Sequence, residues 1–204
     1  MQRLLTHPDN PQGRFIEQAA QVVEEGGLII YATDTVYGLG CNLFDKRAVE
    51  KIYQIKGKKK RATLGIICPN LKDIAKYAHV STPAYKIMRS LLPGPFTFIL
   101  EATRTVPKIL VEKRKTIGIR VPDNNICHML LEECGHPLIS TSLNLPNIPY
   151  LNDPDEIEDT FYHQVDLFLD SGFGGLVPST VIDLTGPDPE VIREGKGAEA
   201  LSLV

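Results

Sequence analysis

The chain has 204 residues, of which 43% are hydrophobic and 23% are charged, and its formal net charge is −3. This balance is ordinary for a globular protein, and it excludes a surface that attracts nucleic acid through overall positive charge. No apolar run reaches the roughly 18 residues that span a membrane, and residues 1–9 lack the apolar core of a signal peptide. We therefore expect a cytoplasmic protein with one domain and no membrane segment.

Helical and extended patterns alternate along the chain, which is typical of an α/β fold. Asn10 and Pro11 favour the start of a first helix, Gly26 ends it, and Asp45 and Ser81 are expected to cap two more. The other helices are expected over 126–134 and from 153, and the strands over 28–31, 64–68, 96–100, 116–121, 137–141, 165–169, 180–184 and 191–193. Because some strands follow one another without a helix between them, the sheet should be mixed.

The spacing of cysteine and histidine favours neither disulfides nor a metal site. The four cysteines form no Cys-x-x-Cys pair, and the five histidines are equally scattered. Buried, reduced thiols are the simplest interpretation, and we expect no metal bound by the protein itself.

Hydroxyl side chains gather at three places where a predicted strand begins or ends. Residues 31–40 follow a buried strand and combine Thr33, Asp34, Thr35 and Tyr37 with two glycines, whereas a simple turn needs one or two such residues. Residues 140–144 and 178–180 are the other two places. Ligands bind at strand ends in open α/β sheets, so we expect the three to form one site for a polar substrate. A capped turn before a helix is the alternative for 31–40.

Positive charge is concentrated in one run and at two strand ends. Residues 56–61 hold five cations in six positions, either as a solvated loop or as an anion-binding loop. Arg120 and Arg193 each end an apolar strand, and an arginine there needs an acidic partner, either a structural carboxylate or a ligand anion. The sequence has no P-loop and no Gly-x-Gly-x-x-Gly, so a bound nucleotide would depend on hydroxyls and these cations.

Taken in order, seven motifs resemble the YrdC-like family. The motifs are YATDTVYGLG at 31–40, IKGK at 55–58, LPGPFTFIL at 92–100, IRVP at 119–122, STSLN at 140–144, PSTV at 178–181 and IREG at 192–195. The resemblance implies one domain over 12–197, with terminal segments at 1–11 and 198–204. It also implies a twisted mixed sheet flanked by helices around a positively charged groove.

The resemblance implies the chemistry of a nucleotidyltransferase, L-threonylcarbamoyladenylate synthase. Threonine, bicarbonate and ATP with Mg²⁺ would give threonylcarbamoyl-AMP and pyrophosphate, for N6-threonylcarbamoylation of adenosine in tRNA. The threonine site would comprise Thr35, Arg120, Ser140 and Ser179. The nucleotide would contact Lys56, Lys58, Thr116, Ser142, Asn144 and Arg193, and catalysis would depend on Lys56, Lys58, Ser142 and Asn144.

Two positions depart from the synthase pattern. Lys58 replaces an arginine, whose planar fork a lysine cannot reproduce, and Ile67 stands where synthases carry a histidine. The amino-acid sequence at 112–122 and 141–146 is most similar to that of the YciO branch of the family. One alternative is therefore an RNA-binding protein with weak or lost synthase activity, which would bind tRNA or double-stranded RNA through Lys58, Lys59, Lys60 and Arg61. A second alternative is a related enzyme with a different amine substrate.

Overall fold

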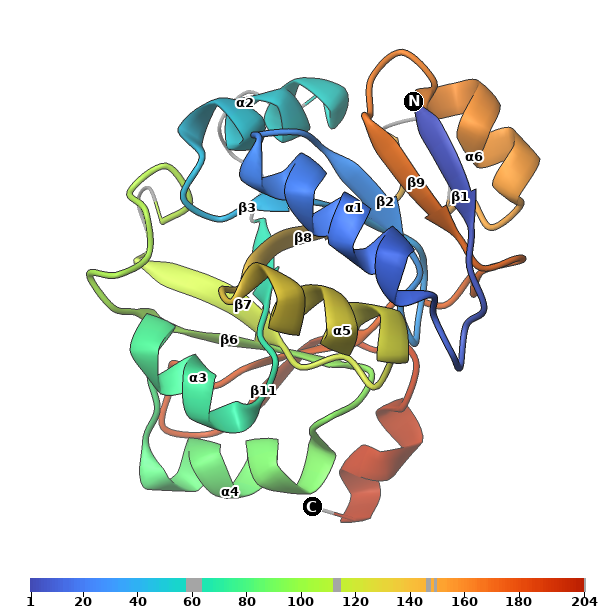
Figure 1. Ribbon diagram of the computed structural model, residues 1–204. Coiled ribbons are helices and arrows are strands. Elements are labelled where there is room, and N and C mark those ends of the chain that lie inside the picture. Colours follow the sequence, from blue (N-terminus) through green and yellow to red (C-terminus); the bar gives the residue numbers. More distant parts are fainter. Residues whose placement is uncertain (58–63, 112–114, 146–147, 149, 204) are drawn as a thin grey trace.

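A computed structural model describes residues 1–57, 64–111, 115–145, 148 and 150–203. Within this part, eleven strands form one mixed sheet in the order β1-β9-β2-β3-β8-β4-β7-β6-β10-β11, with β5 paired to β6 (Figure 1). The strands are β1 (Gln2–Leu5), β2 (Ile29–Tyr31), β3 (Gly38–Asn42), β4 (Gly65–Ile67), β5 (Ala78–His79), β6 (Phe96–Ala102), β7 (Thr116–Arg120), β8 (Leu138–Ser142), β9 (Leu167–Asp170), β10 (Thr180–Asp183) and β11 (Glu190–Arg193). The single α/β domain with a mixed sheet is thus confirmed.

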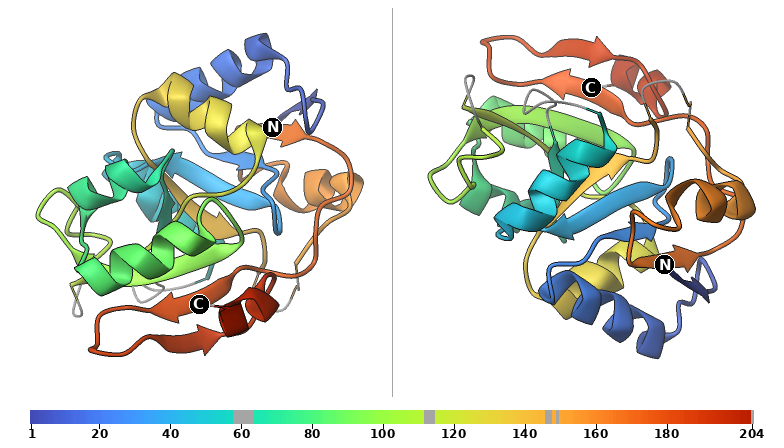
Figure 2. Two further views of the ribbon diagram at one scale, coloured as in Figure 1. Left: turned by 90° about the horizontal axis from the view of Figure 1, so that it is seen from below. Right: turned by 90° about the horizontal axis from the view of Figure 1, so that it is seen from above.

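Helices cover the sheet, and capping side chains fix where they begin. They are α1 (Gly13–Glu24), α2 (Lys46–Ile55), α3 (Leu71–Tyr77), α4 (Thr82–Leu91), α5 (Asn125–Cys134), α6 (Pro154–Phe161) and a short 3-10 helix, η1 (Ala198–Leu203). As expected, Asp45 accepts two backbone N–H groups of α2 and Ser81 accepts one of α4. Figure 2 shows α1 and α5 side by side at one side of the molecule and the β10–β11 hairpin at the other. No helix in the described ranges is long and apolar enough to cross a membrane.

Five elements differ from the sequence predictions. The first helix begins at Gly13, after a Gln12 cap that makes no side-chain hydrogen bond, and not at Asn10. The strands β1, β3 and β5 were not expected, because each is short and its pairing partner, not its own sequence pattern, defines it. Helix α3 was also missed, although Asn70 caps it and Ile74 is buried.

The direction of the strands brings three distant segments to one edge of the sheet. Strand β7 is antiparallel to β6, and β6 is parallel to β10. The C-terminal end of β7 therefore lies beside the N-terminal ends of β6 and β10. This arrangement places Arg120, Thr97 and Ser179 within reach of one another, although 82 positions separate the latter two.

Residues near the N-terminus belong to the sheet, although the sequence assigned 1–11 to a terminal segment. Strand β1 pairs in parallel with β9, with Leu4 opposite Leu169. The Arg3 guanidinium lies 2.8 Å from the carboxylate of Asp170, whose side chain is 2% exposed, and also pairs with Asp155 and Glu158. The edge of the domain therefore depends on an ion-pair cluster between its first and ninth strands.

Replacing Arg3 with methionine should lower the free energy of unfolding by about 3 kcal/mol, because Asp170 would remain buried without its cation. Guanidinium chloride unfolding measures this change. Arg47→Met, at an exposed position on α2, is the control and should stay within about 0.5 kcal/mol of wild type. Equal stability of the two variants would contradict the role given to Arg3.

All four cysteines are free thiols, as expected, and three of them are buried. Burial raises the pKa of Cys41, Cys68 and Cys127 far above the ordinary value of 9.0, and it raises the pKa of the Cys134 thiol to about 12. The native state therefore retains thiol protons that the unfolded chain loses once the pH exceeds about 9.

The contribution of these thiols to stability should consequently be constant below about pH 9, and stability should fall as the pH rises beyond it. The unfolded state then binds fewer protons than the native state, so each such thiol lowers the unfolding free energy by roughly 1.4 kcal/mol per pH unit. Guanidinium chloride titrations at pH 8, 9.5 and 10.5 measure the slope, and Cys134→Ala should reduce it. A flat profile across this range would show that the thiols ionise in the native protein.

Candidate functional site

Buried polar residues are few, and most of them are predicted site residues. In the described ranges seven polar or charged residues are buried: Thr6, Thr35, Lys56, Arg120, Asp170, Ser179 and Thr180. Four of these, Thr35, Lys56, Arg120 and Ser179, were selected from the sequence. Burying such groups is unfavourable unless they are paired, so their partners define what the site can do.

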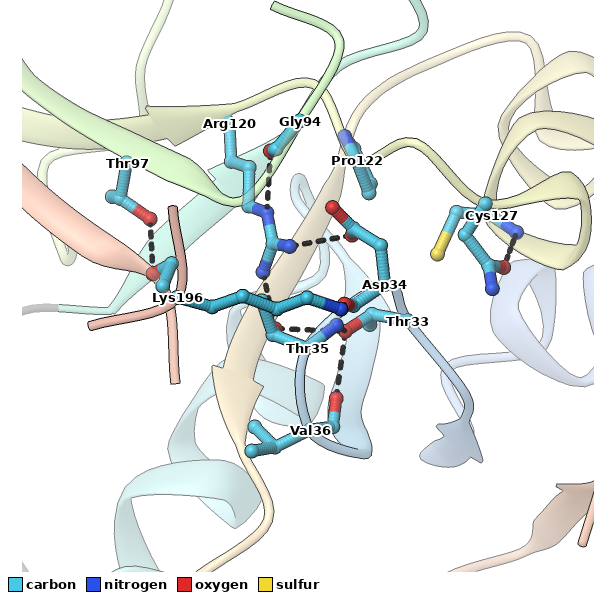
Figure 3. Close-up of polar contacts among 12 residues, drawn as sticks. Thr33, Asp34, Thr35, Val36, Gly94, Thr97, Arg120, Pro122, Cys127 and Lys196 are labelled. Carbon is cyan, nitrogen blue, oxygen red and sulfur yellow. Dashed lines mark hydrogen bonds and ion pairs between the residues drawn. The ribbon is translucent and has the colours of Figure 1, made fainter. Parts of the chain in front are cut away.

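Arg120 ends β7 and is held on three sides. Its Nη1 donates to Thr35 Oγ1 at 2.7 Å, its Nη2 pairs with Asp34 Oδ1, and its Nε donates to the carbonyl of Gly94 at 3.3 Å (Figure 3). The sequence left a structural carboxylate and a ligand anion as alternatives for this arginine. The structure supplies the carboxylate, Asp34.

Residues 33–36 form a tight turn that directs two side chains at Arg120. Thr33 Oγ1 donates to the Val36 carbonyl at 2.7 Å and accepts the Thr35 N–H at 3.0 Å. Its only hydroxyl hydrogen is thereby used, so in the 3.1 Å contact between the two hydroxyls Thr35 must be the donor. Thr35 Oγ1 thus donates to Thr33 and accepts from Arg120, and its position is fixed.

Asp34 carries an unusual feature for a partly buried acid. One carboxylate oxygen pairs with Arg120, while Oδ2 is buried without a hydrogen-bond partner among the described residues. Orphaned buried acceptors are rare in proteins and often occur at functional sites. The Arg120–Asp34 pair carries no net charge, so it adds no excess positive charge to the site.

A second group of contacts surrounds Ser179, just before β10. Ser179 Oγ lies 2.8 Å from Thr97 Oγ1, and the Arg193 guanidinium donates to the Ser179 carbonyl at 2.8 Å and to its hydroxyl at 3.2 Å. Arg193 was expected beside a nucleotide, and in the structure it is directed at Ser179. This places Arg193 beside a predicted threonine-binding residue.

Lys196 connects the Arg120 and Ser179 groups. Its backbone N–H donates to the Pro178 carbonyl at 2.8 Å, and its Nζ donates to the Asp34 carbonyl at 2.6 Å. In Figure 3 its side chain lies across the view from the Thr97 side toward Asp34 and Thr35. The sequence gave no role to Lys196, because only its spatial neighbours identify it.

Lys56 forms a third group with the segment that follows β8. Its Nζ donates to the carbonyls of Ser142 and Asn144, at 2.8 and 2.6 Å, and contacts Asn144 Oδ1. The Leu143 N–H in turn donates to the Tyr37 carbonyl at 2.8 Å, which joins this group to the 33–37 turn. The structure therefore brings Lys56, Ser142 and Asn144 together, with Lys56 holding the backbone of the other two.

Ser140 lies on β8, where it accepts a 2.8 Å hydrogen bond from the Tyr31 hydroxyl. Burial raises the pKa of Tyr31, so this hydroxyl remains a donor at neutral pH. Gly40 makes the contact possible, because a Cβ there would lie 2.8 Å from Tyr31 Cε1 and 2.7 Å from the Ile139 carbonyl. The glycine in this motif thus provides room for Tyr31.

The remaining predicted residues are less closely grouped. Thr116 begins β7, four residues before Arg120, so about 13 Å of extended strand separates the two. Ile67 is buried on β4 and lies opposite Arg120 in the register with β7. The residues Lys58, Lys59, Lys60 and Arg61 lie outside the described ranges.

Sequence reasoning missed several groups that complete the site. Asp34 lies in the motif at 31–40 but was not identified as the partner of Arg120. Thr97 lies between two buried phenylalanines on β6, and this alternation predicts a strand but gives no sign of a functional residue. Lys196 follows Gly195, whose Cβ would lie 2.3 Å from the Pro178 carbonyl, and such close backbone contact cannot be read from sequence.

Comparison with known proteins identifies the family of this chain. The family model described as Telomere recombination, for Sua5, YciO and YrdC proteins, matches residues 21–195. The Escherichia coli K12 protein YciO is 47% identical over 94% of each chain, and the E. coli YciO crystal structure superposes with a TM-score of 0.92 over 96% of each chain.

More distant relatives carry a named activity. The threonylcarbamoyl-AMP synthase of Pyrococcus abyssi is 31% identical over 88% of this chain and 54% of its own length. The crystal structure of P. abyssi Sua5 complexed with L-threonine has a TM-score of 0.89 at 29% identity, over 96% of this chain and 58% of the other. The chain therefore belongs to the Sua5/YciO/YrdC family, and among these relatives it is more similar to YciO than to the synthases.

Proposed function

We propose that the protein is an ATP-dependent enzyme of the threonylcarbamoyl-AMP synthase type. It would convert threonine, bicarbonate and MgATP to threonylcarbamoyl-AMP, pyrophosphate and water, for N6-threonylcarbamoylation of adenosine in tRNA. The observation that carries the proposal is the convergence of Thr35, Arg120 and Ser179, from three separate segments, at one edge of the sheet. A relative with the same fold is crystallised with L-threonine, which supports an amino acid as the ligand of this edge.

The proposed roles follow from the chemistry of these groups. The Arg120 guanidinium would face the threonine carboxylate, with hydroxyls of Thr35, Ser140 and Ser179 around the rest of the amino acid. The Lys56 group would position residues 142–144 beside the triphosphate, with Lys58, Thr116 and Arg193 as further contacts. Catalysis would be mainly positioning and charge stabilisation at the α-phosphorus, where pyrophosphate leaves.

The decisive test is a reaction with purified protein, ATP, Mg²⁺, L-threonine and bicarbonate, followed by chromatography of the nucleotides and a pyrophosphate assay. An adenylate that requires both threonine and bicarbonate is expected. Folded protein that yields neither the adenylate nor pyrophosphate would refute the proposal. Other amino acids in place of threonine test the alternative of a different amine, for which buried Ile67 beside Arg120 is the structural reason.

A further inference from the structure

We propose that Lys196 is a further substrate-binding residue, whose ammonium leaves the Asp34 carbonyl to bind an anionic oxygen of the substrates. The oxygen belongs either to the amino acid carboxylate or to a phosphate of the nucleotide. The inference rests on the proposed function and extends it by a residue outside the seven motifs.

The backbone at Lys196 is fixed, so its side chain starts from a defined place. Its N–H donates to the Pro178 carbonyl, and its own carbonyl accepts the Thr180 hydroxyl at 3.0 Å. Gly195 allows this approach because a larger residue would clash with Pro178, and Gly197 has a φ of +84°, which favours glycine. The segment is thus built to place one lysine beside Ser179.

The Lys196 side chain reaches across the site and remains accessible. Lys196 is exposed, and its Nζ donates to the Asp34 carbonyl 162 positions away. The side chain lies beside the Arg120 and Thr35 contacts in Figure 3. A lysine has four rotatable side-chain bonds and three donors, so the ammonium can change acceptor while the backbone stays in place.

The charges of the site favour such a change. The positive charge of Arg120 is compensated by Asp34, and Lys56 is buried against three oxygen atoms of 142–144. Lys196 donates instead to a neutral carbonyl. A hydrogen bond to a carboxylate or phosphate oxygen is roughly twice as strong as a neutral one, so an anion placed here would displace the Asp34 carbonyl.

Titration calorimetry on the full chain tests the proposal, with separate titrations of MgATP and of L-threonine at one ionic strength. Lys196→Met should bind one of the two ligands at least about tenfold more weakly than wild type, and the affected ligand identifies the anion. Lys86→Met, at an exposed position on α4, is the matched control and should bind both as wild type does. Lys196→Arg should recover part of the affinity, which a purely structural role would not require.

The outcomes separate this inference from the proposed function. The inference alone would be overturned if Lys196→Met melts at the wild-type temperature and binds both ligands within twofold of the wild-type affinity. Wild-type protein that binds neither ligand and forms no adenylate would refute the proposed function and the inference together.

Discussion

Replacing Arg120 with methionine is expected to abolish threonine binding and to lower the free energy of unfolding by about 3 to 5 kcal/mol. The ligand effect follows from losing the guanidinium that would face the carboxylate. The stability effect follows from Asp34, which is 11% exposed and would be left buried without its cation. Calorimetry with L-threonine and guanidinium chloride unfolding measure the two effects separately.

A second substitution separates charge from packing at this position. Changing Asp34 to asparagine in the Arg120→Met background removes the unpaired charge, so it should restore part of the lost stability without restoring threonine binding. Arg89→Met, on the exposed side of α4, is the control for a lost arginine and should be neutral. If Arg120→Met is as stable as this control, the Asp34 pair does not stabilise the fold.

Replacing Lys56 with methionine is expected to lower stability by about 3 kcal/mol and to weaken ATP binding at least tenfold. Lys56 is 5% exposed, and its ammonium satisfies three oxygen atoms of Ser142 and Asn144. Buried acceptors that lose their donor cost roughly 1 to 3 kcal/mol each. Residues 142–144 would then lose the position from which they are proposed to contact the triphosphate.

Lys51→Met is the matched control, since Lys51 is an exposed lysine on α2, the helix that Lys56 follows directly. It should change neither the unfolding free energy by more than about 0.5 kcal/mol nor the affinity for ATP. A Lys56→Met variant that loses stability but binds ATP normally would restrict Lys56 to a structural role. A variant that keeps both properties would contradict the contacts described for Lys56.

The sequence predicted most of the elements, because their signals are local. Asp45 and Ser81 cap helices where expected, and the apolar strands at 96–100 and 116–121 lie within one residue or two of their predicted bounds. The strand β3 was missed because Gly38 and Gly40 carry no side chain that marks a strand, and only pairing with β2 and β8 reveals it.

Several residues of the site were predicted from the sequence, but the contacts between them were not. The sequence placed the hydroxyls of Thr35 and Ser179 beside strand ends, as the structure does, whereas Ser140 lies in the middle of β8. The partner of Arg120 could not be predicted, because the sequence does not distinguish an arginine that pairs with an acid of the chain from one that binds a ligand anion. Lys196 was missed for a related reason: its partners lie 18 and 162 positions away, and close packing at Gly195 brings them together.

The strand order also has a consequence for how the protein is made. The groups around Arg120 and Ser179 come from the segment after β2, from β6 and β7, and from residues 179–196, so the last contributor, Lys196, follows Asp34 by 162 positions in the chain. A ribosome adds about 5 to 20 residues per second, and domains generally fold as units. The nascent chain therefore has no complete site until residue 196 has been synthesised and has left the ribosome.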